Sequence, residues 1–259
     1  MKKVLIGVVL GLMIVVVGVT SYFIGTRSSA SKAEKLIYFD EPEEAIMKFV
    51  ESVNDADMPG IKEAFGIAVK TEGFDYGKYA EVLKSISPMA GMPEGNELFR
   101  EMNEIYFATQ VYSQLKTFFM ILNTDAFVGM TYIIDISNSD NTIESLDQDL
   151  DDFIADYEDI QEIEVIGIYR YTEFDDDERH QENMQKRSKP FGAENSYDCA
   201  LVFEYDRNDY VLGITVYEYD EGYIISSLNS VFLDTGFGIP SKLDDDWEDL
   251  IDDECEKLY

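Results

Sequence analysis

The chain has 259 residues, and its 53 acidic and 20 basic side chains give a formal charge of −33. A surface of this charge repels nucleic-acid phosphates and anionic lipid head groups, so it argues against nucleic-acid binding and favours basic peptides or proteins as partners. Hydrophobic residues make up 46% of the chain, which is enough apolar surface for a core and argues against global disorder.

The uncharged stretch 4–25 predicts a transmembrane helix. At ~1.5 Å per residue it is ~33 Å long, enough for a hydrocarbon layer of ~30 Å. Cleavage after Ser28-Ser29-Ala30 is the alternative, although a signal peptide has a shorter apolar core. The short basic head 1–3 favours an uncleaved signal anchor with a cytoplasmic amino terminus. We therefore expect a single-pass protein of a bacterial cell membrane, with the bulk of the chain extracytoplasmic.

Helices are predicted next, after a tether at 26–40. The first begins at 41–44, because proline and acidic residues suit the first turn of a helix. Apolar residues at helical spacing predict a second, short helix from Pro59, a third over Tyr76–Ile86 and a fourth after a cap at Asn96.

Alternating apolar residues then predict a β-hairpin made of Tyr112–Leu122 and Ala126–Ile136. An inserted helix is expected at 142–158, followed by a strand at Val165–Phe174 and a charged loop at 175–196.

Three antiparallel strands in meander order are predicted last, and the turn Asp220-Glu221-Gly222 between two of them is a strong hairpin signal. The strands are Tyr197–Tyr205, Tyr210–Tyr219 and Tyr223–Phe232. An acidic C-terminal helix at 234–259 has the apolar stripe Leu243, Trp247, Leu250 and Ile251. Helices first and strands second indicate an α+β domain at 41–233, in which helices pack on a curved, mainly antiparallel sheet behind the N-terminal transmembrane helix.

Three segments resemble a known superfamily. They are EPEEAIMKFVESVNDADMPGIKEAF, LNTDAFVGMTYIIDIS and VLGITVYEYDEGYIISS. Together they are similar to membrane-anchored, uncharacterised proteins of Gram-positive bacteria in the nuclear transport factor two-like (cystatin-like cone) superfamily. Tyr223 stands where that superfamily usually has a tryptophan. The resemblance implies helices and a curved sheet around a cone that can hold a ligand. It does not imply a function, because the superfamily contains enzymes, binders and dimerisation modules.

The sequence predicts no catalytic or cofactor-binding residue. His180, the single histidine, falls in the predicted charged loop and is interpreted as solvated, because a catalytic base needs a positioned partner. Cys199 could act as a nucleophile beside His180, but it falls in a predicted strand. Cys199 and Cys255 form either a disulfide or two thiols.

No metal-binding residue is predicted either. Calcium-loop spacing is present at Asp147, Asp149, Asp151 and Glu158. Asp152 occupies the position that needs glycine, and the apolar spacing of the same segment is helical. The acidic runs 175–178 and 244–246 are interpreted as solvated charge. Strand tyrosines either line a pocket or pack the sheet; they are Tyr169, Tyr171, Tyr205, Tyr217, Tyr219 and Tyr223.

We therefore expect a non-catalytic, membrane-anchored, extracytoplasmic binding or protein-interaction module. Its ligand is unknown; a protein, a peptide or an envelope component is expected, with basic partners favoured, and a homodimer is a further option. One alternative is an accessory or sensor subunit of an envelope complex, which an exposed stripe around Trp247 would favour. The other is an enzyme that acts on a small molecule in a pocket of the cone.

Overall fold

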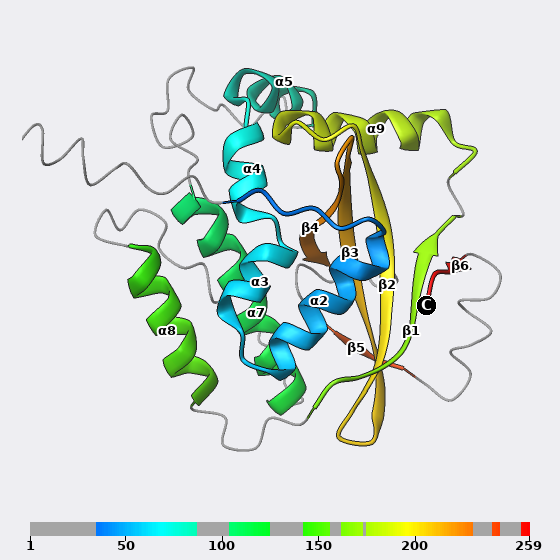
Figure 1. The fold of residues 1–259 in the computed structure, drawn as a ribbon. Helices are drawn as coiled ribbons and strands as arrows, with labels where there is room; N and C mark the ends of the chain where they lie inside the picture. The colour runs from blue at the N-terminus through cyan, green and yellow to red at the C-terminus, as the bar shows by residue number, and fades with distance from the viewer. Residues whose placement is uncertain are drawn as a thin grey trace, which may run out of the picture. The chain divides into compact units, whose positions relative to one another are not determined.

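The computed structural model describes residues 35–86, 104–124, 142–155, 162–172, 175–229, 240–243 and 255–259 (Figure 1). The predicted head 1–3, the predicted transmembrane segment 4–25 and the tether up to residue 34 lie outside these ranges. Within them, no helix combines the length and the apolar character that crossing a membrane requires. Residues 36–259 belong to one structural unit.

The first helices in the described residues are α2 (Pro42–Asn54), α3 (Met58–Ala64) and α4 (Ile67–Gly73). Helix α2 starts where the sequence predicts, with the proline and two glutamates in its first turn. The helix predicted from Pro59 is in fact two helices, because Gly66 adopts a left-handed conformation (φ 51°) between them. A side chain at Gly66 would bring its Cβ to 2.5 Å from Ile224, so the close approach also requires glycine.

Helix α5 (Tyr76–Ile86) confirms the prediction to the residue. The predicted strand Tyr112–Leu122 is wrong, because these residues belong to α7 (Glu104–Thr124). Their apolar residues fit a helical stripe as well as an alternation, and the buried members of the stripe are Phe107, Val111, Leu115, Phe118 and Leu122. The predicted partner strand Ala126–Ile136 lies outside the described residues. The inserted helix is confirmed as α8 (Ile143–Ala155).

The sheet is antiparallel throughout its described strands. They are β1 (Glu164–Tyr171), β2 (Asn195–Tyr205), β3 (Asn208–Tyr219), β4 (Gly222–Asn229), β5 (Ser241–Lys242) and β6 (Cys255–Lys257). The order is β4-β3-β2-β1-β6, with β5 paired to β3. This arrangement confirms the α+β class and the meander β2-β3-β4, for which the predicted turn at 220–222 joins β3 to β4.

Two further predictions are corrected. The predicted loop 175–196 contains α9 (Glu178–Ser188) and a 3-10 turn, η1 (Lys189–Phe191). Asp177 caps α9 by accepting hydrogen bonds from the N–H groups of Arg179 and His180. The helix buries little besides Met184 and Ser188, so its sequence lacks an apolar stripe. Cys255–Lys257 is a strand and not the end of the predicted C-terminal helix, whose Trp247 lies outside the described residues.

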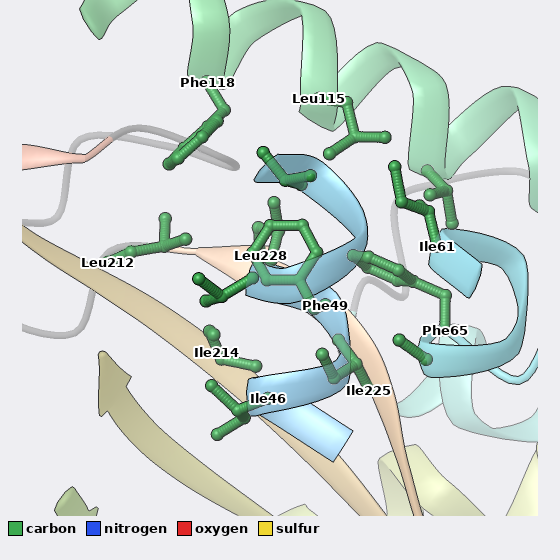
Figure 2. Close-up of a cluster of buried hydrophobic side chains, with 14 of the residues drawn as sticks. Ile46, Phe49, Ile61, Phe65, Leu115, Phe118, Leu212, Ile214, Ile225 and Leu228 are labelled. Carbon is green, nitrogen blue, oxygen red and sulfur yellow. The ribbon is translucent and has the colours of Figure 1, made fainter. Parts of the chain in front are cut away.

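The core lies between the helices and one face of the sheet (Figure 2). We call this face, which carries Phe203, Leu212 and Ile214, the inner face; Ala200 and Val202 lie on the outer face. Phe49 of α2 is at the centre of the core, where its ring meets Phe65 edge-on at 5.7 Å and Phe118 at 6.2 Å. The chain's own aromatic side chains therefore fill this part of the interior.

Candidate functional site

The structure argues against Cys199 as a nucleophile. Its thiol is fully buried on the inner face of β2. Burial, reinforced by Asp198, raises the pKa of the Cys199 thiol to about 12. A reactive cysteine needs the opposite, an accessible thiol with a lowered pKa. His180 lies in the first turn of α9 rather than in a loop.

Cys199 and Cys255 do not form a disulfide. Cys199 contributes to the core on the inner face of β2, whereas Cys255 packs against the cluster of Tyr169 and Ala200 on the outer face. Strands β2 and β6, which carry the two cysteines, lie on opposite sides of β1. Both the distance between the two side chains and their opposite directions therefore argue against a disulfide.

The calcium-like spacing belongs to a helix, as predicted. Asp147 of α8 accepts a hydrogen bond from the Tyr112 hydroxyl and forms a 2.9 Å ion pair with Lys62. Glu158 lies outside the described residues. In the ranges that the structure describes, no three His, Cys, Asp or Glu side chains are grouped so that they could hold a metal ion.

We expect Asp147→Asn to lower the free energy of unfolding by about 1–2 kcal/mol, because it breaks a partly buried, charge-assisted contact between α8, α3 and α7. Urea denaturation of the full chain measures the change. Asp149→Asn, at an exposed position of the same helix, is the control and should have little effect. Equal losses for the two variants would show that the Asp147 contacts do not hold α8.

The most unusual polar arrangement crosses four strands on the inner face. Arg170 of β1, Tyr197 of β2, Glu218 of β3 and Tyr223 of β4 form what we call the polar row. The register places Glu218 opposite Tyr223, and Arg170 opposite Cys199, two residues from Tyr197. All four side chains are half-buried. The polar row therefore lies on the same face of the sheet as the apolar core, and its side chains remain partly accessible to solvent.

Glu218 is the centre of the row. Its two carboxylate oxygens accept hydrogen bonds from the Tyr197 hydroxyl at 2.6 Å and from the Tyr223 hydroxyl at 3.2 Å. The Arg170 guanidinium lies 5.6 Å from the centre of the Tyr197 ring. Burial, followed by the hydrogen bond to Glu218, raises the pKa of Tyr197 to about 12. Both tyrosines therefore stay protonated and hold the carboxylate in place.

Further carboxylates surround this end of the sheet. Asp220, and more weakly Glu218 and Glu221, raise the pKa of Glu194. Burial and Glu218 raise the pKa of Tyr223, and Glu41 and Glu43 contribute. Arg170 is itself neutralised by Asp175 at 2.9 Å and Glu256 at 3.2 Å. The local field is therefore negative and favours a cation.

Two of the tyrosines named from the sequence hold α9 and η1 on the sheet instead of lining a pocket. The buried Tyr217 and Tyr219 donate hydrogen bonds to the carbonyls of Arg187 and Phe191, at 3.4 and 3.3 Å. Sequence reasoning named Tyr223 but missed the rest of the polar row. Whether these residues lie on the same face of the sheet depends on the strand register, and no local sequence pattern determines that register.

Lys70 is a second unusual group. Its side chain is 4% exposed, and its ammonium donates to the Ser226 carbonyl at 3.2 Å. The nitrogen lies 5.7 Å from the Phe65 ring centre and 5.9 Å from that of Phe107. Ser226 sits at the register shift between β3 and β4, where one residue of β4 has no ladder partner. No acidic side chain in the described ranges pairs with Lys70, and burial lowers its pKa to about 7.

Neither a family model nor a curated protein matches the chain. Among solved structures, it is similar to a cystatin-like protein from Ruminococcus gnavus, with a TM-score of 0.43 and 12% sequence identity. The alignment covers 79% of this chain and 45% of that protein, so this chain spans less than half of its length. A similarity at this level carries no argument about function.

Proposed function

We propose that the chain is a non-catalytic binding module, held at the cell membrane by residues 4–25 with its bulk outside the cytoplasm, and that the polar row binds a basic segment of a partner protein. The observation that carries the proposal is Glu218, a carboxylate fixed between two tyrosine hydroxyls at a negatively charged end of the sheet. A lysine or arginine side chain of the partner would meet this carboxylate.

Several features of the row suit a cationic ligand. Tyr197 already has a guanidinium over its ring, which shows that a planar cation fits against it. The overall charge of −33 would steer a basic partner toward the domain.

The packed interior also supports surface binding rather than chemistry in a deep pocket. Phe49, Phe65 and Phe118 are buried at the centre of the described core. A small molecule would have to displace them to enter, and removing a buried phenylalanine from its site costs about 3–5 kcal/mol.

Calorimetry with the full chain in detergent micelles tests this function. We expect a lysine-rich peptide to bind, an aspartate-rich peptide of equal length not to bind, and the affinity to fall as salt rises. Glu218→Gln should weaken binding about fivefold, because it removes the central charge. Glu204→Gln, at an exposed position of β2, is the matched control and should leave binding unchanged. Equal affinity for the two peptides, or equal effects of the two substitutions, would refute the proposal.

The location is tested separately. In bacterial cells that produce the full chain, the protein should resist alkaline extraction from membranes, and protease added outside intact spheroplasts should degrade residues 36–259. A chain that alkali releases has no membrane anchor. A membrane-bound chain protected from external protease has the opposite orientation.

We also propose that the domain is a member of the nuclear transport factor two-like superfamily. Its support is the order of helices before an antiparallel sheet, with α2 and α3 and the β3–β4 hairpin at two of the segments that resemble the superfamily. The helical Tyr112–Leu122 segment counts against it. A crystal structure in which residues 126–136 do not join the sheet would contradict this membership.

A further inference from the structure

The far edge of β1, on the side away from β2, is occupied by a very short strand. Strand β6 pairs antiparallel with β1 over three residues, from Tyr171–Cys255 to Tyr169–Lys257. Three more backbone hydrogen bonds extend the ladder: the Leu258 and Tyr259 N–H groups donate to the Ile168 carbonyl at 2.8 and 3.1 Å, and Ile168 N–H donates to the Tyr259 carbonyl at 3.2 Å. So few pairs make β6 a weakly held edge strand.

The side chains of this segment alternate between two kinds of contact. On the inner face, Glu256 accepts hydrogen bonds from Arg170 at 3.2 and 3.3 Å, and Leu258 packs against the core. On the outer face, Lys257 Nζ lies 5.9 Å from the Tyr169 ring centre. At this edge, an acidic residue of β6 thus meets Arg170, and an apolar residue two positions later packs against the core.

Strand β1 offers more edge than β6 uses. Among the residues that the structure describes, no strand pairs with Glu164–Gly167 on this side of β1. Ile166 in this stretch has 38% of its surface exposed, and it sits at a register shift in the pairing with β2. An antiparallel strand that continued past the position of Tyr259 would run along this open stretch and could form further backbone pairs.

We propose that the far edge of β1 is a binding site for an extended segment of a partner protein, with an acidic residue opposite Arg170 and an apolar residue two positions later, and that β6 is its intramolecular occupant. Strand addition obtains its affinity from backbone hydrogen bonds and its specificity from alternate side chains, and both are present here. The tethered β6 competes through its high local concentration, so a longer or better-matched strand is needed to replace it. This site shares Arg170 with the polar row, but its ligand pairs with the backbone edge of β1, whereas the proposed basic segment meets the Glu218 carboxylate.

A charge exchange across the Arg170–Glu256 pair tests the site. The probe is a fluorescent peptide with the sequence of residues 253–259, serine in place of its cysteine and four further residues, Thr-Val-Thr-Val, at its carboxyl end. A second peptide has arginine in place of the glutamate that faces Arg170. Fluorescence anisotropy measures the binding of both peptides to the full chain in detergent micelles.

In the Glu256→Arg chain the internal strand is repelled by Arg170. We expect the glutamate peptide to bind this chain about tenfold more tightly than the arginine peptide, because reversing the charge replaces attraction with repulsion. In the Arg170→Glu chain the preference should reverse. Arg179→Glu, an exposed position on α9, is the matched control and should behave as the unaltered chain. If Glu256→Arg fails to fold by circular dichroism, Glu256→Gln weakens the internal strand more gently and keeps the expected preference.

Three results would overturn the site. They are equal binding of both peptides to both variants, binding of neither peptide to any folded variant, and self-association of the chain without peptide binding. A peptide that lacks the four added residues should bind more weakly than the full probe. Equal affinity of the short and long peptides would contradict the role of the open stretch Glu164–Gly167.

Discussion

Lys70→Met is expected to raise the free energy of unfolding by about 2 kcal/mol at pH 7. Lowering the pKa of a lysine from 10.5 to about 7 means that holding it in the folded chain at neutral pH costs about 4 kcal/mol. Methionine has a similar length and no charge, so it removes this cost. It also gives up the hydrogen bond from the charged ammonium to the Ser226 carbonyl, which is worth about 2 kcal/mol.

The same substitution should change how stability depends on pH. Between pH 7 and pH 10.5 the unfolded chain keeps the proton of Lys70 while the folded chain loses it. The contribution of Lys70 to the free energy of unfolding therefore rises as the pH increases from 7 to 10.5, and it stays constant below pH 7. The gain from Lys70→Met should be largest at pH 7 and smallest at pH 10.

Denaturant unfolding of the full chain at pH 7 and pH 10 measures both effects. Lys78→Met is the control, because the Lys78 side chain is 57% exposed and its substitution should change stability little. A loss of stability in Lys70→Met at pH 7 would mean that the ammonium has a stabilising partner and is not a buried, uncompensated charge.

Phe49→Ala is expected to lower the free energy of unfolding by about 3–5 kcal/mol, the usual cost of removing a fully buried phenylalanine. Phe49 is completely buried, and its ring meets those of Phe65 and Phe118 edge-on (Figure 2). The substitution loses the free energy gained by transferring the ring out of water. It also leaves a cavity, because the closely packed neighbours do not move far enough to fill it.

Thermal and urea unfolding of the full chain measure this loss. Tyr259→Ala removes an aromatic ring that is 56% exposed, and it should cost much less. A Phe49→Ala chain of unchanged stability would show that the interior around this residue is loosely packed. That result would support the alternative in which a small molecule binds inside the cone.

The fold was predictable wherever a single period dominates the sequence. Helix α5 and the strands β2, β3 and β4 follow from apolar spacing and from the turn at 220–222. The α7 segment was misread because Tyr112–Leu122 contains large apolar residues at both alternating and helical intervals, and packing against the sheet decides between them. Helix α9 was missed because a surface helix with few buried residues has almost no apolar signal.

The candidate site was harder to predict than the fold. Glu218 is one of 53 acidic residues, and nothing in its neighbours along the chain distinguishes it. Its two tyrosine partners come from β2 and β4, so the site exists only once both strands have their register. Lys70 shows the same limit, because its burial results from Phe65, Phe107 and Ser226, which are distant in sequence or on other elements.

The central claim is that ligands bind at the polar row and not inside the packed core. Nuclear magnetic resonance of the full chain in detergent micelles, with labelled tyrosine and phenylalanine rings, tests it during titration with a lysine-rich peptide. We expect the ring signals of Tyr197 and Tyr223 to shift to saturation while those of Phe49 and Phe118 stay in place. Shifts of the two phenylalanines with unchanged tyrosines would contradict the account and place the ligand in the core.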